Sequence, residues 1–239
     1  MRRLFCSLLM VFVFLPLLCP SAAAQTTEQQ FWPEVNFFLK IRPRLRGDFV
    51  CARAEEPGDN RSIELGPDIE FYFKQFVKNP IKTNNTANRQ LQTIRVGYRY
   101  LAGVGQPSEN RMVVQGTTRF PIGWSMVLAD RNRIDLRWVQ GEPFSWRYRN
   151  RLLLERSFKI KRVSFTPYID GEIMWVSTTQ SWSQTLGDIG VTFPVAKWLE
   201  FTPYYQRNNK SGSNGSSATQ TNAIGFIAAF YFSLPGASK

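Results

Sequence analysis

Histidine is absent from this chain, and its absence removes a large share of catalytic chemistry. Without an imidazole there is no Ser–His or Cys–His nucleophile pair, no imidazole metal ligand, and no imidazole base for neutral pH. Cysteine is scarce as well. Cys6 and Cys19 lie near the N-terminus, which leaves Cys51 with no partner for an internal disulfide or a metal cluster. We therefore expect no enzyme, no metal site and no cofactor.

The N-terminus has the pattern of a secretory signal peptide. Arg2 and Arg3 precede an apolar run that extends to Cys19, and small residues follow at Ala22 and Ala24. A charged start, a short apolar centre and an A-x-A site are the three parts of an export signal. A membrane-anchor helix is the alternative, but the run is short for a span of about 20 residues. The pattern predicts a signal peptide over residues 1–24, a single domain over 25–232 and a tail over 233–239.

Basic residues outnumber acidic ones, with 30 Lys and Arg against 18 Asp and Glu and a formal net charge of +12. Such an excess can indicate nucleic-acid binding. An export signal argues against that partner, because it takes the chain out of the cytoplasm. We expect no nucleic-acid partner.

Long hydrophobic runs are missing from the chain after residue 24, and the longest one, Ala223 to Phe232, is too short for a membrane helix. Apolar residues instead recur at every second position, as in Val35, Phe37 and Leu39, which is the pattern of strands with two different faces. The pattern predicts an all-β fold of about ten strands, an even number. They are expected over residues 34–46, 63–74, 93–100, 111–120, 124–139, 144–158, 163–175, 184–193, 198–206 and 221–232.

The connections between these strands fall into two length classes. Tight turns at 120–123, 159–162 and 194–197 alternate with longer, more polar loops at 55–61, 102–110, 177–183 and 208–220. Two segments are exceptions: 140–143 is short on the long-loop side, and 77–90 is long on the short-turn side. Short turns at one end and longer loops at the other are typical of an antiparallel transmembrane β-barrel with periplasmic turns and extracellular loops.

Alternation alone does not say which face points inward, since a soluble lipocalin-like barrel alternates too. The apolar face carries most of the aromatic residues, which is too much bulk for the interior of a ten-stranded barrel. Aromatic residues also lie near the strand ends, with aliphatic residues between them, as a bilayer selects. We therefore expect an outer-membrane barrel over residues 25–232. The expected membrane-interface aromatics are Trp124, Trp138, Trp146, Trp198 and Phe232.

Several short motifs accompany this pattern. They are Phe31-Trp32-Pro33-Glu34, Glu109-Asn110-Arg111, the charged stretch from Asp130 to Arg137, Trp146-Arg147-Tyr148-Arg149 and Glu155-Arg156. Together they resemble a domain-of-unknown-function family of predicted bacterial outer-membrane β-barrels, with an N-terminal Trp and an R-x-R-x-E-x-R central hairpin. Asp135 stands here where the family has Glu. The resemblance implies a Gram-negative outer-membrane location and implies no activity.

The last expected strand, 221–232, resembles the C-terminal assembly signal of outer-membrane proteins, although the chain continues to Lys239. This resemblance implies the barrel-assembly machinery as a partner during biogenesis, beside the outer-membrane lipid bilayer itself.

With the apolar face in lipid, the charged face lines the lumen. The residues expected to form a charge network there are Arg42, Arg44, Arg95, Arg99, Arg131, Arg133, Asp135, Arg137, Arg147, Arg149, Arg151, Glu155, Glu64, Asp68, Glu70, Asp170 and Glu172. A hairpin folded about Gly141 pairs Arg133 with Arg149 and Arg131 with Arg151. Like charges directly opposite are unfavourable. These arginines must therefore reach acids on other strands, an anion or water.

Three functions remain open. An envelope structural protein fits best, because a barrel of about ten strands is narrow enough for charged side chains to fill. A narrow, porin-like passage that prefers anions is the alternative, since basic residues outnumber acidic ones on the charged face. An outer-membrane enzyme is the remote third possibility, because barrels that resemble omptin proteases, acyltransferases and phospholipases rely on histidine.

One group of polar residues conflicts with the pattern. Asp130, Asn132 and Asn150 fall on the expected lipid face, and the hairpin places Asn132 opposite Asn150. Polar groups in lipid are costly. Either a β-bulge reverses the facing locally, which we take as the default, or Asn132 and Asn150 form an oligomer contact.

Overall fold

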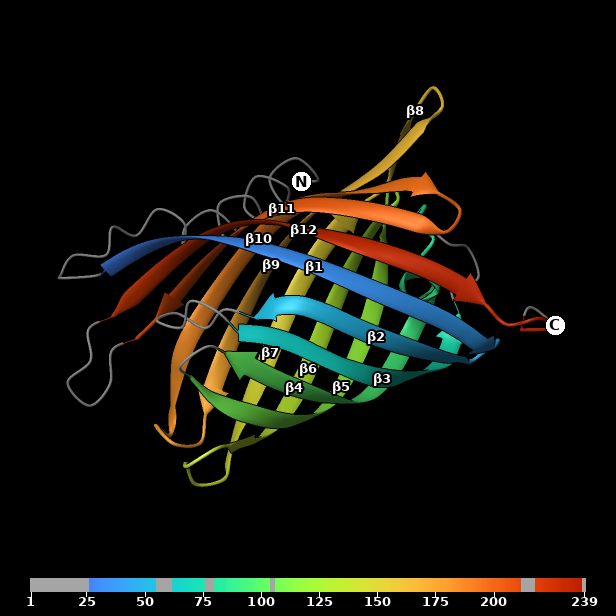
Figure 1. Ribbon diagram of the computed structural model, residues 1–239. Coiled ribbons are helices and arrows are strands. Elements are labelled where there is room, and N and C mark those ends of the chain that lie inside the picture. Colours follow the sequence, from blue (N-terminus) through green and yellow to red (C-terminus); the bar gives the residue numbers. More distant parts are fainter. Residues whose placement is uncertain (1–25, 55–61, 76–79, 104–105, 212–217, 238–239) are drawn as a thin grey trace.

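The structure is a computed structural model that describes residues 26–54, 62–75, 80–103, 106–211 and 218–237 (Figure 1). The predicted signal peptide, with Cys6 and Cys19, lies outside these residues. The described chain is all β apart from one short 3-10 helix, η2 (Thr86–Arg89). None of the described segments forms a helix with the length and apolar character needed to cross a membrane.

The described strands close into an eleven-stranded barrel (Figure 1). The strands are β1 (Thr26–Arg42), β2 (Leu45–Ala54), β3 (Ser62–Gln75), β4 (Gln90–Gly103), β5 (Gln106–Gly123), β6 (Met126–Val139), β7 (Ser145–Arg156), β8 (Phe158–Ile160), β9 (Val163–Val176), β10 (Ser181–Ala196), β11 (Leu199–Lys210) and β12 (Thr219–Ser233). Their order around the barrel follows the chain. The short strand β8 pairs only with β9 and extends that hairpin beyond the barrel wall.

Closure of the barrel makes its sheet mixed. Neighbouring strands are antiparallel except β1 and β12, which run parallel from the Thr26–Thr219 pair to the Lys40–Ser233 pair. In a barrel whose strands alternate in direction, an odd number of strands makes the first and the last run the same way. The predicted all-β barrel is confirmed, with eleven strands in its wall instead of ten.

The additional strand comes from the stretch 34–46, which the alternation predicts as one strand. In the structure β1 ends at Arg42, Pro43 and Arg44 form a tight turn, and β2 begins at Leu45. Proline suits a turn because its ring fixes φ and it has no N–H to donate. Arg42 and Arg44 are exposed at this turn. Their predicted place in the lumen is therefore wrong.

The two ends of the barrel are named here by their connections. The turn end carries the β1–β2, β3–β4, β5–β6, β7–β8, β8–β9 and β10–β11 connections, and the loop end carries the other five. The predicted contrast in length is only partly present. β4 ends at Gly103 and β5 begins at Gln106, so most of the loop predicted over 102–110 is strand. The longest connection, 76–89, lies at the turn end.

Burial alternates along the strands, with the charged side chains inside. On β3, Asp68 and Glu70 are 3% and 1% exposed, whereas Ile69 and Phe71 are 49% and 44% exposed. The same alternation continues around the barrel, where most exposed large side chains are apolar. A soluble globular protein distributes its side chains the other way, with apolar groups inside and charges in solvent.

The five predicted interface aromatics lie on the outer surface near the strand ends. Trp124 and Trp198 belong to turns at the turn end, and Phe232 lies one residue before the end of β12. Trp138 and Trp146 flank the β6–β7 connection at the loop end. Their exposed fractions range from 38% for Trp146 to 73% for Trp124. Both ends of the apolar outer face therefore carry aromatic side chains.

The hairpin predicted about Gly141 is confirmed in its register. Arg133 pairs with Arg149, Arg131 with Arg151, and Asp135 with Arg147. The β6–β7 ladder has no register shift along its length, so the β-bulge that we took as the default is wrong.

Asp130, Asn132 and Asn150 do face outward on this hairpin, and they bond to one another. Asn150 Nδ2 donates to Asp130 Oδ1 at 2.8 Å and to Asn132 Oδ1 at 3.1 Å. The Tyr148 hydroxyl also donates to Asn132 Oδ1, at 2.5 Å. The outer face of this hairpin therefore holds a small hydrogen-bonded cluster in a largely apolar surface.

Candidate functional site

The inner faces of β2, β3 and β4 carry a buried ion cluster. Arg46 Nε lies 2.7 Å from Asp48 Oδ1, and Arg46 Nη2 lies 2.6 Å from Glu70 Oε2. Arg95 bridges Asp48 and Glu70 at 3.1 and 3.4 Å. The guanidinium of Arg46 also lies over the Phe38 ring, 4.2 Å from its centroid. Each buried charge here has opposite charges beside it, which is the condition for burying ions at tolerable cost.

Arg99 continues this cluster toward the loop end. Its Nη1 donates to Asp68 Oδ1 at 2.6 Å, and its Nε lies 3.1 Å from Glu64 Oε1. Gly97 makes the pair possible, because a Cβ at that position would lie 1.5 Å from Asp68 Oδ1. Arg111 extends the chain of charges, with Nη1 3.7 Å from Glu64 Oε2.

Glu109 joins this cluster to the arginines of β6. Arg111 Nε donates to Glu109 Oε1 at 2.7 Å, and Arg137 Nη2 donates to Glu109 Oε2 at 2.7 Å. Glu109 is 6% exposed. One carboxylate thus bridges two arginines on neighbouring strands.

Asp135 is the centre of the β6–β7 arginines and is fully buried, with 0% exposure. Arg133 Nε donates to Asp135 Oδ1 at 2.5 Å, and Arg147 Nη2 lies 3.4 Å from Asp135 Oδ2. Arg149 Nη1 lies 3.8 Å from the same oxygen. The acid that stands where the resembled family has Glu therefore holds three arginines together.

Of the arginines that face each other across β6 and β7, three bond to acids on β9 and β10, which is one of the three expected alternatives. Arg131 and Arg149 both bond to Glu172, and Arg149 Nε does so at 2.5 Å. Arg151 Nη2 lies 2.5 Å from Asp170 Oδ2 and 3.5 Å from Asp188 Oδ2. Their like charges are thus separated by carboxylates from the next strands.

The surplus of arginines expected in the lumen is not present. Arg42 and Arg44 are exposed at the β1–β2 turn, and Asp48 and Glu109 are buried acids that were not predicted in the lumen. Asp48 was missed because the predicted strand ended at residue 46. The other predicted network residues lie on inward positions, and Glu155 is buried on β7. Opposite charges in the interior are therefore close to balance.

The two sides of the lumen differ in charge. The charged wall is formed by the inner faces of β2 to β7, β9 and β10, which hold the ion pairs described above. The polar wall is formed by the inner faces of β11, β12 and β1. Its buried side chains are mostly uncharged, such as Gln206, Asn208 and Thr221 at 8%, 2% and 0% exposure.

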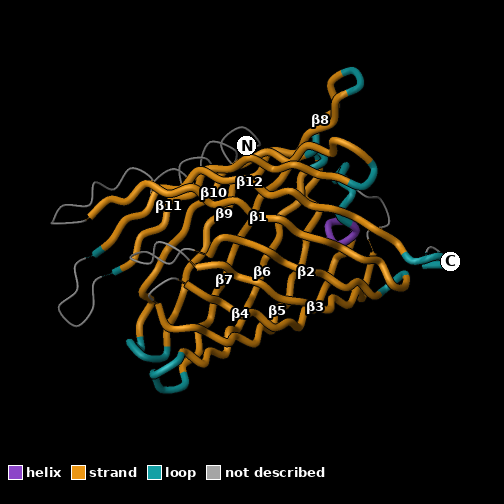
Figure 2. Tube along the Cα trace, viewed as in Figure 1, coloured by secondary structure: helices purple, strands orange, loops and turns teal. Residues whose placement is uncertain are grey.

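The segment 80–89 between β3 and β4 folds into the turn end of the barrel, and we call it the plug. Its helix η2 lies within the ring of strands (Figure 2). Ile81 and Ala87 are 1% and 2% exposed. Thr83 Oγ1 and the Asn84 backbone N–H both donate to Glu200 Oε1 on β11.

Further bonds hold the plug to other strands. Asn85 Oδ1 accepts from Arg46 Nη1 at 2.6 Å, and the Lys82 N–H donates to Ser157 Oγ at 2.8 Å. Because β11 lies across the ring from β3 and β4, the plug crosses the mouth of the barrel. This explains why 77–90 is long on the side where other connections are short.

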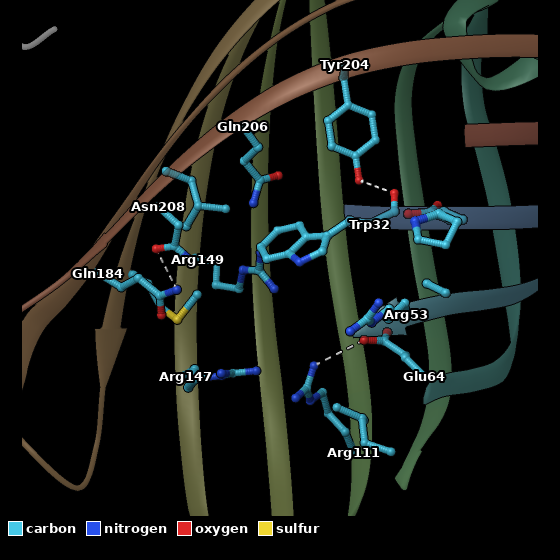
Figure 3. Close-up of a pocket in the computed structure, with 16 residues that line it drawn as sticks. Trp32, Arg53, Glu64, Arg111, Arg147, Arg149, Gln184, Tyr204, Gln206 and Asn208 are labelled. Carbon is cyan, nitrogen blue, oxygen red and sulfur yellow. Dashed lines mark hydrogen bonds and ion pairs between the residues drawn. The ribbon is translucent and has the colours of Figure 1, made fainter. Parts of the chain in front are cut away.

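A cavity of about 210 Å³ occupies the loop-end half of the lumen (Figure 3). Its polar-wall lining includes Trp32, Glu34, Tyr204, Gln206 and Asn208, and its charged-wall lining includes Glu64, Arg111, Arg147, Arg149 and Gln184. Trp32 was predicted only as part of a family motif. Its even position in β1, shared with Glu34 and Asn36, is the signal that places it inside.

Comparison with known proteins adds the family. No curated protein and no solved structure matches the chain. Residues 25–220, which include the lumen-lining strands β1 to β11, match the family DUF2490. The expected membership in a family without known function is thereby confirmed, and the chain belongs to DUF2490, a family of proteins of unknown function.

Proposed function

We propose that this chain is a structural β-barrel of the bacterial outer membrane, with a lumen that solutes do not cross and no catalytic role. The observation that carries the proposal is the distribution of side chains: ion pairs fill the interior while Ile, Leu, Val and Phe cover the outside. In a bilayer the outer apolar face meets lipid tails, and the closed ladder satisfies the backbone polar groups.

Two further features support the membrane location. Aromatic residues gather near both ends of the outer face, where interfacial Trp and Tyr lie in membrane proteins. The family match begins at Gln25, the first residue after the predicted cleavage site. The loop end would face the cell exterior and the turn end the periplasm. The barrel-assembly machinery would act on β12, whose outward side chains include Phe226, Phe230 and Phe232.

Closure of the lumen rests on the plug and on the ion pairs. The plug crosses the turn end, and the charged wall presents its arginines already bonded to carboxylates. Narrow barrels are filled by their own side chains, whereas open channels need about sixteen strands. A near-balance of charges also removes the surplus on which anion preference would depend.

Quenching by brominated lipids tests the membrane location. In vesicles, Trp124 and Trp198 are exposed on the outer face and should be quenched, whereas Trp32 lies inside the lumen. Trp124→Phe and Trp198→Phe should each reduce the quenchable fluorescence, and Trp32→Phe should leave it unchanged. A mature chain that stays soluble without detergent and resists quenching would show that the protein is not a membrane barrel.

Planar bilayers test the closed lumen. The wild-type protein should give no ohmic current. A variant in which residues 80–89 are replaced by a short Gly-Ser linker is the matched comparison, since it removes the plug and leaves the barrel strands. Anion-selective current through the wild type would favour the narrow, porin-like passage instead. Current in the variant alone would identify the plug as the barrier.

A further inference from the structure

The loop-end cavity lies between two kinds of side chain. In Figure 3, Tyr204 and Gln206 approach from β11, Arg147 and Arg149 from β7, and the Trp32 ring projects between them. The Tyr204 hydroxyl donates to the Trp32 carbonyl oxygen at 3.1 Å, which ties β11 to β1 across β12. An aromatic, hydrogen-bonding side thus faces a guanidinium side.

Three arginines that line the cavity, Arg111, Arg147 and Arg149, already have acidic partners. Arg111 pairs with Glu109 at 2.7 Å, and Arg147 with Asp135 at 3.4 Å. Arg149 pairs with Glu172 and lies 3.8 Å from Asp135. A simple anion would therefore have to compete with carboxylates for these guanidinium groups.

Glu34 differs from the other acids of the lumen wall around it. Its Oε1 accepts from Asn36 Nδ2 at 2.5 Å, and no ion pair joins it to a lysine or arginine in the part of the chain that the structure describes. It lines the cavity two positions after Trp32, on the same face of β1. A carboxylate in such a place is stabilised by a cation. The cavity therefore has one acid outside the ion pairs of the described residues, beside an indole ring, and the exposed Arg53 also lines it.

We infer that this cavity binds a small zwitterion. The cationic end of the ligand lies at Glu34 and Trp32, since carboxylates and aromatic faces both attract organic cations. The carboxylate end shares Arg147 and Arg149 with Asp135 and Glu172, since a guanidinium has five donors and can bond to more than one carboxylate. A cavity of about 210 Å³ has room for roughly eight non-hydrogen atoms, because about 150 Å³ admits benzene. Glycine betaine has this size and both charges.

The first experiment compares three probes on the purified full-length mature protein in detergent, by isothermal titration calorimetry. Glycine betaine carries both charges. The probe 3,3-dimethylbutanoate has the same shape without the cation, and choline lacks the carboxylate. Betaine should bind about thirtyfold more tightly than either, as expected for loss of one buried charge contact. Equal binding of betaine and dimethylbutanoate would show an anion site and overturn the inference.

The second experiment uses a matched pair of variants on β1. Glu34→Gln should weaken betaine binding by about thirtyfold and leave dimethylbutanoate binding unchanged. Glu28→Gln is the control, because Glu28 lies on the same inward face but outside the cavity lining. Trp32→Phe should weaken betaine binding by roughly threefold to thirtyfold. Circular dichroism verifies that each variant is folded.

Two further results would contradict the inference. One is an equal loss of betaine affinity in Glu28→Gln and Glu34→Gln, which would show that the overall charge of the lumen, and not a contact at Glu34, attracts the ligand. The other is the absence of heat from all three probes with a folded wild type. Both results leave the membrane proposal unaffected, because the cavity belongs to the barrel in any environment.

Discussion

The charged wall and the polar wall enclose the same lumen but are stabilised in different ways. On the charged wall most carboxylates pair with two or three arginines, as Asp135 does with Arg133, Arg147 and Arg149. On the polar wall, small and uncharged residues allow close packing at the parallel β1–β12 seam. A Cβ at Gly225 would lie 2.3 Å from the Trp32 carbonyl oxygen. Electrostatic pairing therefore governs one wall and shape governs the other.

The largest expected effect is on the charged wall. Asp135→Asn leaves three arginines around a neutral side chain, and breaking a buried ion cluster costs about 3–5 kcal/mol. We expect the free energy of unfolding in detergent, measured by urea titration, to fall by that amount. Asp130→Asn on the same strand is the control, because Asp130 faces outward and accepts a bond from Asn150.

A second variant distinguishes lost charge balance from lost shape. Arg133→Gln in the Asp135→Asn background removes one of the unmatched positive charges, so part of the lost stability should return. A double variant as unstable as the sum of the single changes would show that the wall depends on individual contacts and not on charge balance.

On the polar wall the corresponding perturbation is steric. Gly225→Ala introduces a Cβ 2.3 Å from the Trp32 carbonyl oxygen and 2.5 Å from Tyr204 Cζ. Overpacking of this kind costs about 1–3 kcal/mol, again measured by urea unfolding. Gly187→Ala is the matched control, since nothing lies within 4 Å of a Cβ there. Equal stability of the two variants would contradict the inference that close steric packing stabilises the polar wall.

The sequence predicts the charged wall better than the polar wall. The β6–β7 register follows from local alternation around Gly141, and each arginine pair is a short-range consequence of that hairpin. The β1–β2 turn at Pro43 is hidden because the apolar alternation continues across it. Since that turn determines whether the strand number is odd or even, the parallel seam was not predictable either.

The plug and the cavity could not be predicted from local sequence patterns, for a different reason. Thr83 and Glu200 are 117 positions apart in the chain, and no periodicity relates them. The only signal was the unusual length of the connection 77–90. Glu34 was predicted only as part of a motif, and its lack of an ion pair among the described residues becomes visible only when all neighbouring strands are in place.

The plug bonds to both walls, to Glu200 on the polar wall and to Arg46 on the charged wall. Removing one of these contacts shows which wall holds the plug in place. Glu200→Ala removes the acceptor of the Thr83 and Asn84 bonds, each worth about 1 kcal/mol or more. We expect trypsin to cleave after Lys82 and Arg89 roughly tenfold faster, as followed by mass spectrometry. Tyr231→Phe is the control, because it removes a bond to Glu200 and leaves the plug contacts. Unchanged cleavage would mean that the Arg46–Asn85 bond of the charged wall suffices.

The smallest effect concerns the outer side of the same β6–β7 hairpin, where we propose an oligomer contact at Asn132 and Asn150. Asn132 and Asn150 already bond to each other within one chain. A second copy would therefore add only about 0.6–2 kcal/mol of binding free energy, the value of side-chain hydrogen bonds between membrane-spanning segments. Asn132→Leu/Asn150→Leu should therefore raise the dissociation constant of any oligomer by up to about thirtyfold in analytical ultracentrifugation. Asn222→Leu is the matched control, since Asn222 also accepts from a tyrosine hydroxyl, that of Tyr205 at 2.9 Å, but on β12. If assembly is the same in all three proteins, the outer cluster stabilises only its own hairpin. The bond between the Asn132 and Asn150 amides then compensates for the lipid contacts that leucine side chains would make.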